Sequence, residues 1–323
     1  MKRLTLIIPL FIALLCPLFM AAEKNDAKKR IVFIAGGRSH GSGEHEFNAG
    51  CHLLAKALNE QSGLNVEAIV LRPDWKKDPS VLDDADTVVF YADATQSIAG
   101  QWEIVDKLSK KGVGLVFMHY QVHPSRDQGH KYYQPWIGGA YESGWSVNPH
   151  WVADLKIKKD HEIGNGVPDS ITCLDEWYYN MRFIEDREKV LDLFTAVPTR
   201  KNMSRYINMW NKHGVNGLDK PQTLMWGYER PAGGRGIGFT GGHYHTTWAV
   251  DGVRTAVLNA IVWTAGLKVP EAGVKSKSPT EDELNENLDL YRGKHARLKL
   301  PNPEDWKKLP PAKIQEKREA GFK

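Results

Sequence analysis

The sequence predicts an α/β fold, with a mainly parallel sheet between layers of helices. Four short runs are mainly apolar and do not alternate between apolar and polar residues, which is typical of strands buried on both faces. Stretches with helical periodicity lie between these runs. The composition is that of a globular protein, with 41% hydrophobic and 25% charged residues in a chain of 323. The expected strands are residues 31–35, 66–71, 87–91 and 113–118.

The stretches between the strands carry apolar residues at helical spacing. A helix is expected over residues 47–59, where Leu54 and Leu58 share one face. A second helix is expected over residues 98–110, with Val105 and Leu108 facing inward. Strands that alternate with helices indicate a parallel sheet that is covered on both faces.

The middle of the chain, from about residue 121 to 222, has a different composition, rich in Trp, Tyr, Gly, His and Pro. Alternating patterns at 151–157 and 176–183 predict antiparallel strands, laid with long loops over one end of the sheet. After this inserted region the parallel pattern is expected to resume in two strands and a closing helix, at 224–228, 236–240 and 252–265.

The N-terminus has the pattern of a secretory signal peptide. An apolar run, Leu4–Ala22, follows Lys2 and Arg3 and ends in small residues. A permanent single-span anchor is the alternative, because the run is nearly long enough to cross a bilayer. Two prolines within the run and its Ala-Ala exit favour cleavage. We therefore expect residues 1–22 to be removed, leaving an exported protein, periplasmic or extracellular, with no stable membrane span.

The remainder is expected to form one domain over residues 30–268. A C-terminal extension, residues 269–323, is rich in Lys, Glu and Pro and cannot form a core alone, so it either wraps the domain or stays loose. The net charge of +4 is too small to indicate a nucleic-acid partner. After signal cleavage Cys51 and Cys173 remain, which allow one disulfide at most and do not suggest a thiolate metal site.

Histidines gather where the expected strands end. Ligands of open parallel sheets bind beyond the carboxyl ends of the strands. Six of the 12 histidines follow expected strands, namely His40, His45, His119, His123, His243 and His245. Neutral imidazole is the commonest transition-metal ligand, so the grouping predicts a divalent metal site, with zinc as the expected ion. Hydrogen-bonding histidines packed against aromatic rings are the alternative. The candidate ligands are His40, His119, His150, His243 and His245.

Other common chemistries find little support in the motifs. The glycines of the loop at 36–50 fit neither the dinucleotide-binding spacing nor a P-loop. The chain has no GxSxG elbow, and neither Cys51 nor Cys173 follows an expected strand in a nucleophile position. Acyl transfer through Ser or Cys is therefore not expected.

Carboxylates and aromatic rings supply the other elements of a sugar site. Proton transfer at a sugar carbon requires a positioned carboxyl group. Glu142 and Glu176 are the first candidates for the base, and Glu44 is a further catalytic candidate. Glu44 and Glu46 would alternatively orient a histidine or favour the start of the first helix. Aromatic rings suit the apolar faces of a pyranose and suit a core equally well. The candidate sugar-binding residues are Tyr120, Trp145, Trp177 and Tyr178.

At these residues the sequence resembles the ThuA-like (trehalose utilisation) family. The resemblance covers residues 31 to about 270 and is carried by GGRSHGSGEHEFNAG (36–50), KKGVGLVFMHY (110–120), WIGGAYESGWSVNPHW (136–151), DEWYYNMRF (175–183) and ERPAGGRGIGFTGGHYHTTW (229–248). It implies a class I glutamine amidotransferase-like fold, that is, a flavodoxin-like three-layer sheet, here with an inserted antiparallel region. In those enzymes a Cys stands at the elbow after a central strand. His119 takes that place here, which removes the thiol chemistry.

The resemblance implies processing of disaccharides or keto-sugars alongside a sugar oxidoreductase. Together with the histidines, it predicts an exported enzyme that isomerises or cleaves a keto-glycoside or disaccharide with the help of a metal. The metal would polarise an oxygen while a Glu moves a proton. The alternative is a non-catalytic carbohydrate-binding protein on the same fold. If the strand assignment is right, the ring nitrogens of His40, His119 and at least one of His150, His243 and His245 converge within about 5 Å of a common point, as ligands of one metal ion must.

Overall fold

The computed structural model describes residues 28–202, 211–289 and 296–309. The expected signal peptide, residues 1–22, lies outside them, as do residues 290–295 and 310–323 of the C-terminal extension. No helix in the described part of the chain combines the length and apolar character needed to span a bilayer.

A nine-stranded sheet forms the centre of the molecule, in the order β2-β1-β3-β4-β11-β10-β9-β6-β7. Its first five strands are parallel, which confirms the predicted parallel sheet. Every residue of β3 and β4 is buried, as their continuous apolar sequences require. The parallel strands are β1 (Lys29–Ala35), β2 (Val66–Leu71), β3 (Thr87–Tyr91), β4 (Gly114–Met118) and β11 (Arg235–Phe239).

The other half of the sheet is antiparallel. It consists of β10 (Gln222–Glu229), β9 (Val190–Ala196), β6 (Trp151–Ile157) and β7 (Ser170–Asp175). The expectation of a parallel strand at 224–228 is wrong, because only residues 230–234 join β10 to β11. So short a connection forms a hairpin, whereas a parallel crossover needs a dozen or more residues.

The inserted region also differs from its prediction. Strand β6 has the predicted bounds, but its partner is β7 rather than residues 176–183. Within 176–183 three successive aromatic residues from Trp177 to Tyr179 are buried, so the apparent alternation does not separate a buried face from an exposed one. Only β8 (Arg182–Phe183) is a strand there, paired with β5 (Gly139–Ala140). Strands β6 and β7 extend the central sheet instead of lying over its end.

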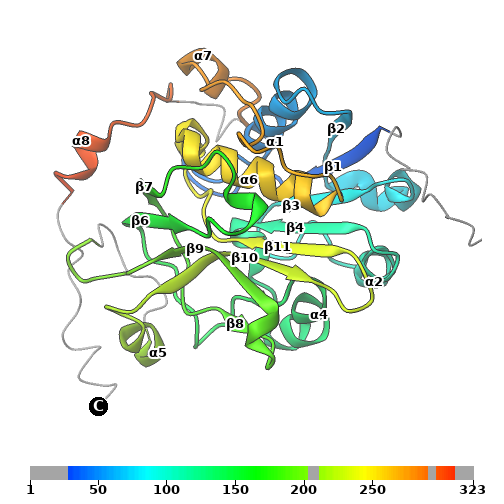
Figure 1. Cartoon of the computed structure of the whole chain (residues 1–323), viewed down its shortest axis with the longest axis horizontal. Coiled ribbons are helices and arrows are strands. Elements are labelled where there is room, and N and C mark those ends of the chain that lie inside the picture. The colour runs from blue at the N-terminus through cyan, green and yellow to red at the C-terminus, as the bar shows by residue number, and fades with distance from the viewer. Residues whose placement is uncertain (1–27, 203–210, 290–295, 310–323) are drawn as a thin grey trace, which may run out of the picture.

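Helices cover both faces of the sheet (Figure 1). On one face, α1 (Phe47–Lys56) and α6 (Asp251–Thr264) share a core with Phe33 of β1. On the other, residues of α2 (Trp102–Lys110) and α4 (Gln134–Ile137) share a second core with Ile34. Adjacent residues of a strand thus enter different cores, and each buried side chain of this size stabilises the fold by about 1.5–3 kcal/mol. The short helices are α3 (Arg126–Gln128), α5 (Lys212–Asn216), α7 (Glu281–Leu284) and α8 (Pro303–Trp306).

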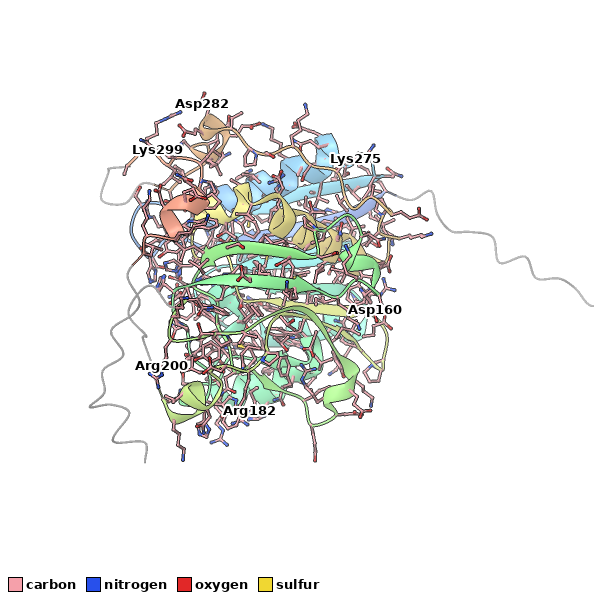
Figure 2. The ribbon with its side chains drawn as sticks, turned by 60° about the vertical axis from the view of Figure 1, so that its left-hand side comes forward. Asp160, Arg182, Arg200, Lys275, Asp282 and Lys299 are labelled. Atoms are coloured by element: carbon pink, nitrogen blue, oxygen red, sulfur yellow. The ribbon has the colours of Figure 1, made fainter. Side chains whose placement is uncertain are left out.

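The described part of the C-terminal extension wraps the domain. Helix α7 packs against α1, and α8 lies beside β7. Figure 2 places Asp282 and Lys299 of the extension at one end of the molecule, with Arg182 and Arg200 at the other. Cys51 and Cys173 are buried and free, so they form no disulfide with each other.

The strand directions determine what meets at the carboxyl edge. From β11 to β7 each pairing is antiparallel, and an even number of reversals leaves β7 parallel to β11. The residue after β7 therefore lies at the same edge as the residues after β1, β3, β4 and β11. The residue before β6 lies there too, because Trp151 pairs with Asp175.

Candidate functional site

Four buried side chains meet at this edge and could hold a metal ion. His45 follows β1, His119 follows β4 directly, His243 follows β11 and Glu176 follows β7 directly. Each offers one ligand atom, and these atoms all lie within 4.8 Å of one another. The four come from distant parts of the chain, and the sheet topology alone brings them together.

The spacing of the four groups fits one ion. Glu176 Oε2 lies 3.5 Å from His119 Nε2 and 3.1 Å from His243 Nδ1. His45 Nε2 lies 2.9 Å from His119 Nε2. Ligand atoms of a tetrahedral zinc ion, each about 2.0–2.2 Å from the metal, are about 3.3–3.6 Å apart. Small movements of these side chains therefore suffice for coordination.

Hydrogen bonds fix the tautomers of two imidazoles. His119 Nδ1 lies 3.0 Å from the Thr240 carbonyl oxygen, which only accepts, so Nδ1 carries the proton. His45 Nδ1 lies 2.8 Å from Asp93 Oδ1 and likewise donates. Both Nε2 atoms are then left as acceptors. A ligating histidine usually donates its other N–H to a carbonyl or carboxylate in this way.

The same two imidazoles are held in their neutral form. Burial lowers the pKa of His45 to about 4, although Asp93 opposes the shift. Burial, together with the nearby His45 and His243, holds the pKa of His119 well below its ordinary value. Because both Nδ1 atoms donate elsewhere, the two Nε2 atoms, 2.9 Å apart, need a shared proton or a metal ion between them. This arrangement fits a bound metal ion better than an empty core.

His243 and Glu176 form the charged part of the cluster. Burial opposes a charge on His243, but Glu176 and Glu44 outweigh it and raise the His243 pKa to about 9. The Glu176 pKa is lowered despite burial, mainly by His243. Neither His243 nitrogen has a partner in hydrogen-bond geometry, although carboxylate oxygens lie 3.1 and 3.7 Å away. Buried nitrogens without well-directed partners are a second observation that fits a ligand.

The backbone at the cluster is strained. His45 and His119 have φ values of 52° and 55°, in the left-handed region that few residues other than glycine adopt. Such conformations persist where surrounding structure enforces them, and they cluster at functional sites. Around His45 the support comes from the loop after β11, since His45 N–H donates to His243 O at 2.9 Å.

Asp175 anchors the loop that carries His243. Its buried carboxylate accepts from the backbone N–H groups of Gly242 at 2.7 Å, His243 at 2.9 Å and Tyr244 at 3.3 Å. It also accepts from the Thr247 hydroxyl at 2.7 Å. The residue before Glu176 thus fixes the position of His243.

Two further predicted ligands flank the cluster. The exposed His40 ring lies 3.7 Å from that of His45, centroid to centroid. His40, His45 and Asp93 form a second group that could hold an ion. The His150 ring lies 4.7 Å from that of His243, and its Nε2 is 3.5 Å from Glu176 Oε1. The edge therefore gathers His40 and His150 around the four central side chains.

Three predicted site residues lie outside the cluster. Glu142 is paired with Arg182 through both carboxylate oxygens, at 3.1 and 3.2 Å. The Trp177 ring is fully buried against Phe239, and its Nε1 donates to Cys173 O, so it belongs to the core. His245 is also fully buried, and no ring contact or ion pair among the described residues joins it to the cluster.

Of the remaining predicted residues, three border the site and Trp145 does not. Tyr178 places its hydroxyl 3.3 Å from His119 Nε2. Tyr120 is half-buried, with its ring 5.9 Å from that of His45. Glu44 Oε1 lies 3.7 Å from His243 Nε2, as expected of a residue that orients a histidine. Trp145 stacks instead on the Arg182 guanidinium, at 3.7 Å.

His45 was not among the predicted ligands, and Asp93 was not predicted to be its partner. Both follow strands that the analysis placed correctly, so the signal was present. Asp93 comes two residues after β3, at the same edge as the loop after β1. A search for carboxylates near the strand-end histidines would have found the pair.

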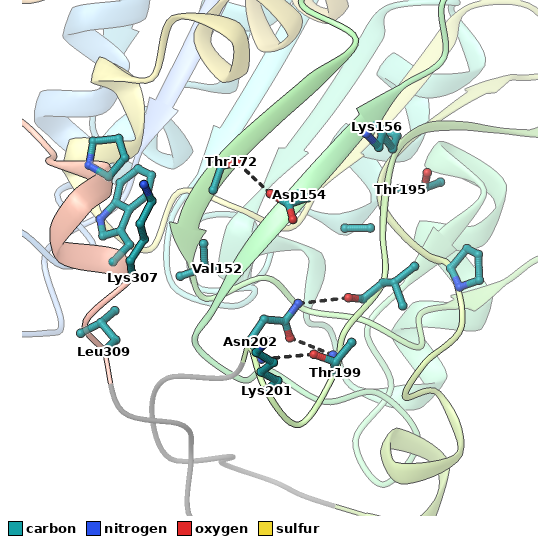
Figure 3. A pocket seen from close by; sticks show the side chains of 15 residues that line it. Val152, Asp154, Lys156, Thr172, Thr195, Thr199, Lys201, Asn202, Lys307 and Leu309 are labelled. Atoms are coloured by element: carbon teal, nitrogen blue, oxygen red, sulfur yellow. Dashed lines mark hydrogen bonds between the residues drawn. The ribbon is translucent and has the colours of Figure 1, made fainter.

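A large cavity lies elsewhere, on the outer face of the antiparallel half of the sheet (Figure 3). It measures about 900 Å³ and lies between β6, β9 and the C-terminal helix α8. Asp154, Thr172 and Lys307 are among its lining residues, and none of the clustered histidines is.

Two solved structures of ThuA-like proteins share this architecture. A ThuA-like protein from Bacteroides uniformis is similar in structure, with a TM-score of 0.55 at 13% identity, over 73% of this chain and 91% of that one. A ThuA-like protein from Parabacteroides merdae gives 0.50 at 17% identity, over 78% and 98%. A glutamine amidotransferase from Thermotoga maritima gives 0.45 at 9% identity, over 74% and 99%. No curated protein matches the sequence.

The sequence itself matches the profile of one family, described as ThuA, trehalose utilisation, over residues 32–264. This match covers the parallel sheet except residues 29–31 of β1, and it includes the inserted antiparallel strands and every residue of the histidine cluster. The chain therefore belongs to the ThuA family.

Proposed function

We propose that this protein is an exported carbohydrate-processing enzyme that isomerises or cleaves a keto-glycoside or disaccharide at a divalent metal site. Family membership supports a sugar as the substrate. The observation that carries the metal is the convergence of His45, His119, His243 and Glu176, whose ligand atoms all lie within 4.8 Å of one another.

We assign the metal to three imidazoles: His45 through Nε2, His119 through Nε2 and His243 through Nδ1. Catalytic zinc sites commonly use three protein ligands and keep a further position open for substrate, and zinc is one of the ions that imidazole donors suit. A bound ion of this kind supplies a Lewis acid that polarises a carbonyl or hydroxyl oxygen.

Glu176 is assigned as the proton-moving group. Its Oε1 accepts from Asn148 Nδ2 at 2.9 Å, and its Oε2 faces His119 and His243, so the carboxylate is held in one orientation. A positioned carboxylate of lowered pKa is ionised at neutral pH and can accept a proton from the carbon beside a keto group. Glu142 cannot share this role, because Arg182 holds both of its oxygens.

Two further parts of the proposal concern context. The cationic and apolar pattern of residues 1–22 supports export. A keto-glycoside must be made by oxidation of a sugar hydroxyl, so a sugar oxidoreductase is the class of enzyme that would supply the substrate.

The test follows deuterium exchange at the carbon next to the keto group of a 3-keto-glycoside. Glu176→Gln is expected to retain metal and lower the exchange rate by roughly 10²–10⁴, the usual share of general base catalysis. Glu142→Gln is the matched control, and its exchange rate is expected to stay close to that of the wild type. Unchanged exchange in Glu176→Gln would refute the assignment of the base.

A further inference from the structure

The C-terminal extension is bonded to the loop that carries His45. We call its described residues 281–289 and 296–300 the C-terminal strap. The backbone N–H of Asp289 donates to Glu46 Oε2 at 3.2 Å, and Arg38 donates to the Asp289 carbonyl. Further along the strap, Ala296 N–H donates to the Ser42 hydroxyl at 3.1 Å. The strap therefore holds the loop at more than one point.

A buried ion pair links the two ends of this loop. Arg38 Nη1 lies 3.2 Å from Glu46 Oε1, and the two side chains are 4% and 0% exposed. Each partner also bonds the backbone between them: Arg38 Nε donates to His40 O at 2.9 Å, and Gly43 N–H donates to Glu46 Oε1 at 3.1 Å. Further hydrogen bonds offset the cost of burying such a pair, and here the loop and the strap supply four of them.

Packing supports the same arrangement. A Cβ atom at Gly43 would lie 2.7 Å from Leu298 Cδ2 of the strap, and Gly43 has a φ of 80°. Gly43 O in turn accepts from His245 N–H at 2.9 Å. The loop is thus enclosed by the strap on one side and by the loop after β11 on the other. His45, in its left-handed conformation, lies between these fixed points.

We propose that Arg38, Glu46 and the part of the C-terminal strap that contacts the loop, residues 289 and 296–298, form a clamp that positions His45 for a divalent cation. Arg38 and Glu46 are positioning residues, because they act on the metal through the backbone that carries His45. The proposal rests on the proposed metal site and adds a role for a segment beyond the family match at residues 32–264. It predicts that damage to the clamp weakens metal binding even where the fold is intact.

The test compares two substitutions in the full-length protein, with Co²⁺ alone as the probe. Glu46→Gln disrupts the clamp. Glu283→Gln is the matched control, because Glu283 belongs to the strap but pairs with Lys56 of α1, at 3.1 Å, and not with the loop. Glu46→Gln is expected to weaken Co²⁺ affinity about 10–100-fold, the usual effect of losing support for a ligand, and to change the visible absorption of bound Co²⁺. Glu283→Gln is expected to leave both unchanged.

A second, milder variant guards against misfolding of Glu46→Gln. Leu298→Ala removes the contact with Gly43 from the strap side at a half-buried position. Its control is Leu300→Ala, at a position that is 46% exposed. Leu298→Ala is expected to weaken Co²⁺ binding and Leu300→Ala to leave it unchanged.

Amide hydrogen exchange of the metal-free proteins separates failure of the clamp from failure of the metal site. The clamp predicts faster exchange at Gly43 and His45 in Glu46→Gln, and not in Glu283→Gln. If the wild type binds no Co²⁺, the proposed metal function fails, and with it the clamp's role toward a cation, whatever the exchange shows. If the wild type binds Co²⁺ while Glu46→Gln and Leu298→Ala bind it equally well, with unchanged spectra and unchanged exchange, the clamp is refuted.

Discussion

Replacing Asp175 by asparagine exchanges one carboxylate oxygen for an amide NH₂ without a change of size. If the asparagine oxygen takes the place of Oδ1, it keeps the bonds from the His243 and Tyr244 N–H groups. The NH₂ group then takes the place of Oδ2, which accepts from Gly242 N–H and the Thr247 hydroxyl, each at 2.7 Å. The hydroxyl can rotate and accept. The Gly242 N–H can only donate, so in the variant it faces the asparagine NH₂ group, which is also a donor, and is left without an acceptor.

The magnitude follows from these contacts. An unsatisfied buried donor costs about 1–3 kcal/mol, and loss of a bond to a charged acceptor costs about 1.5–3 kcal/mol. Burial has the opposite effect on the stability of the variant. It raises the Asp175 pKa, which shows that burying the charged carboxylate is unfavourable, and the neutral asparagine avoids this desolvation cost. We expect Asp175→Asn to lower the free energy of unfolding by about 3 kcal/mol.

Urea unfolding of the metal-free protein measures this change. Asp154→Asn is the control, because Asp154 lies on the neighbouring strand β6, is exposed and accepts one side-chain bond, from Thr172 at 2.7 Å. It is expected to change the free energy of unfolding by less than about 0.5 kcal/mol. Equal unfolding free energies for Asp175→Asn and the wild type would show that the carboxylate does not anchor the loop.

Three further outcomes are expected. In the metal-free protein the His243 pKa is raised from 6.5 to about 9, so its pairing with Glu176 stabilises the fold fully below pH 6.5 and is lost as the pH rises through 9. The loss of unfolding free energy in His243→Gln should therefore be larger at pH 7 than at pH 9.5, and an equal loss would contradict the pairing. Gly238→Ala would place a Cβ 2.0 Å from the buried Trp226 ring and should cost about 3 kcal/mol in urea unfolding, whereas Gly37→Ala, with open space around it, should cost little. Burial raises the pKa of the Cys51 thiol, so thiol reagents should label it only in denaturant, and peptide mass spectrometry showing rapid labelling of the folded protein would contradict its burial.

The parallel half of the fold could be predicted because its strands are apolar on both faces. That pattern does not give strand direction. Only the short connection from β10 to β11, residues 230–234, indicates the direction of β10. It is too short for a parallel crossover, so the two strands must be antiparallel. Strand β7 (Ser170–Asp175) ends directly before residues 176–183, where a strand was predicted. The last residue of β7, Asp175, accepts a hydrogen bond from Gly242 in the loop after β11. A contact between such distant residues cannot be predicted from the hydrophobic pattern of the sequence.

The candidate site was predictable to the level of a sheet edge. Histidines after strands gather there because the carboxyl ends of parallel strands share one edge. Which of the neighbouring His243 and His245 faces the cluster depends on local backbone geometry: the chain turns at Gly242, with a φ of 99°, and a short 3-10 helix begins at His245. Whether an aromatic residue binds a sugar or packs in the core depends on its burial, which the sequence does not give. Trp177 is fully buried and belongs to the core.

The central claim is that His45, His119 and His243, beside Glu176, hold a divalent metal ion. Calorimetric titration of the metal-stripped full-length protein with Zn²⁺ tests it most directly, with His119→Ala as the variant. His130→Ala is the control, since His130 is exposed and lies 3.4 Å from Glu142, outside the cluster. The account predicts about one tightly bound Zn²⁺ per chain in the wild type and the control, and its loss in His119→Ala. A wild type that binds no Zn²⁺, or a His119→Ala variant that binds it equally well, would contradict the account and favour a non-catalytic carbohydrate-binding protein on the same fold.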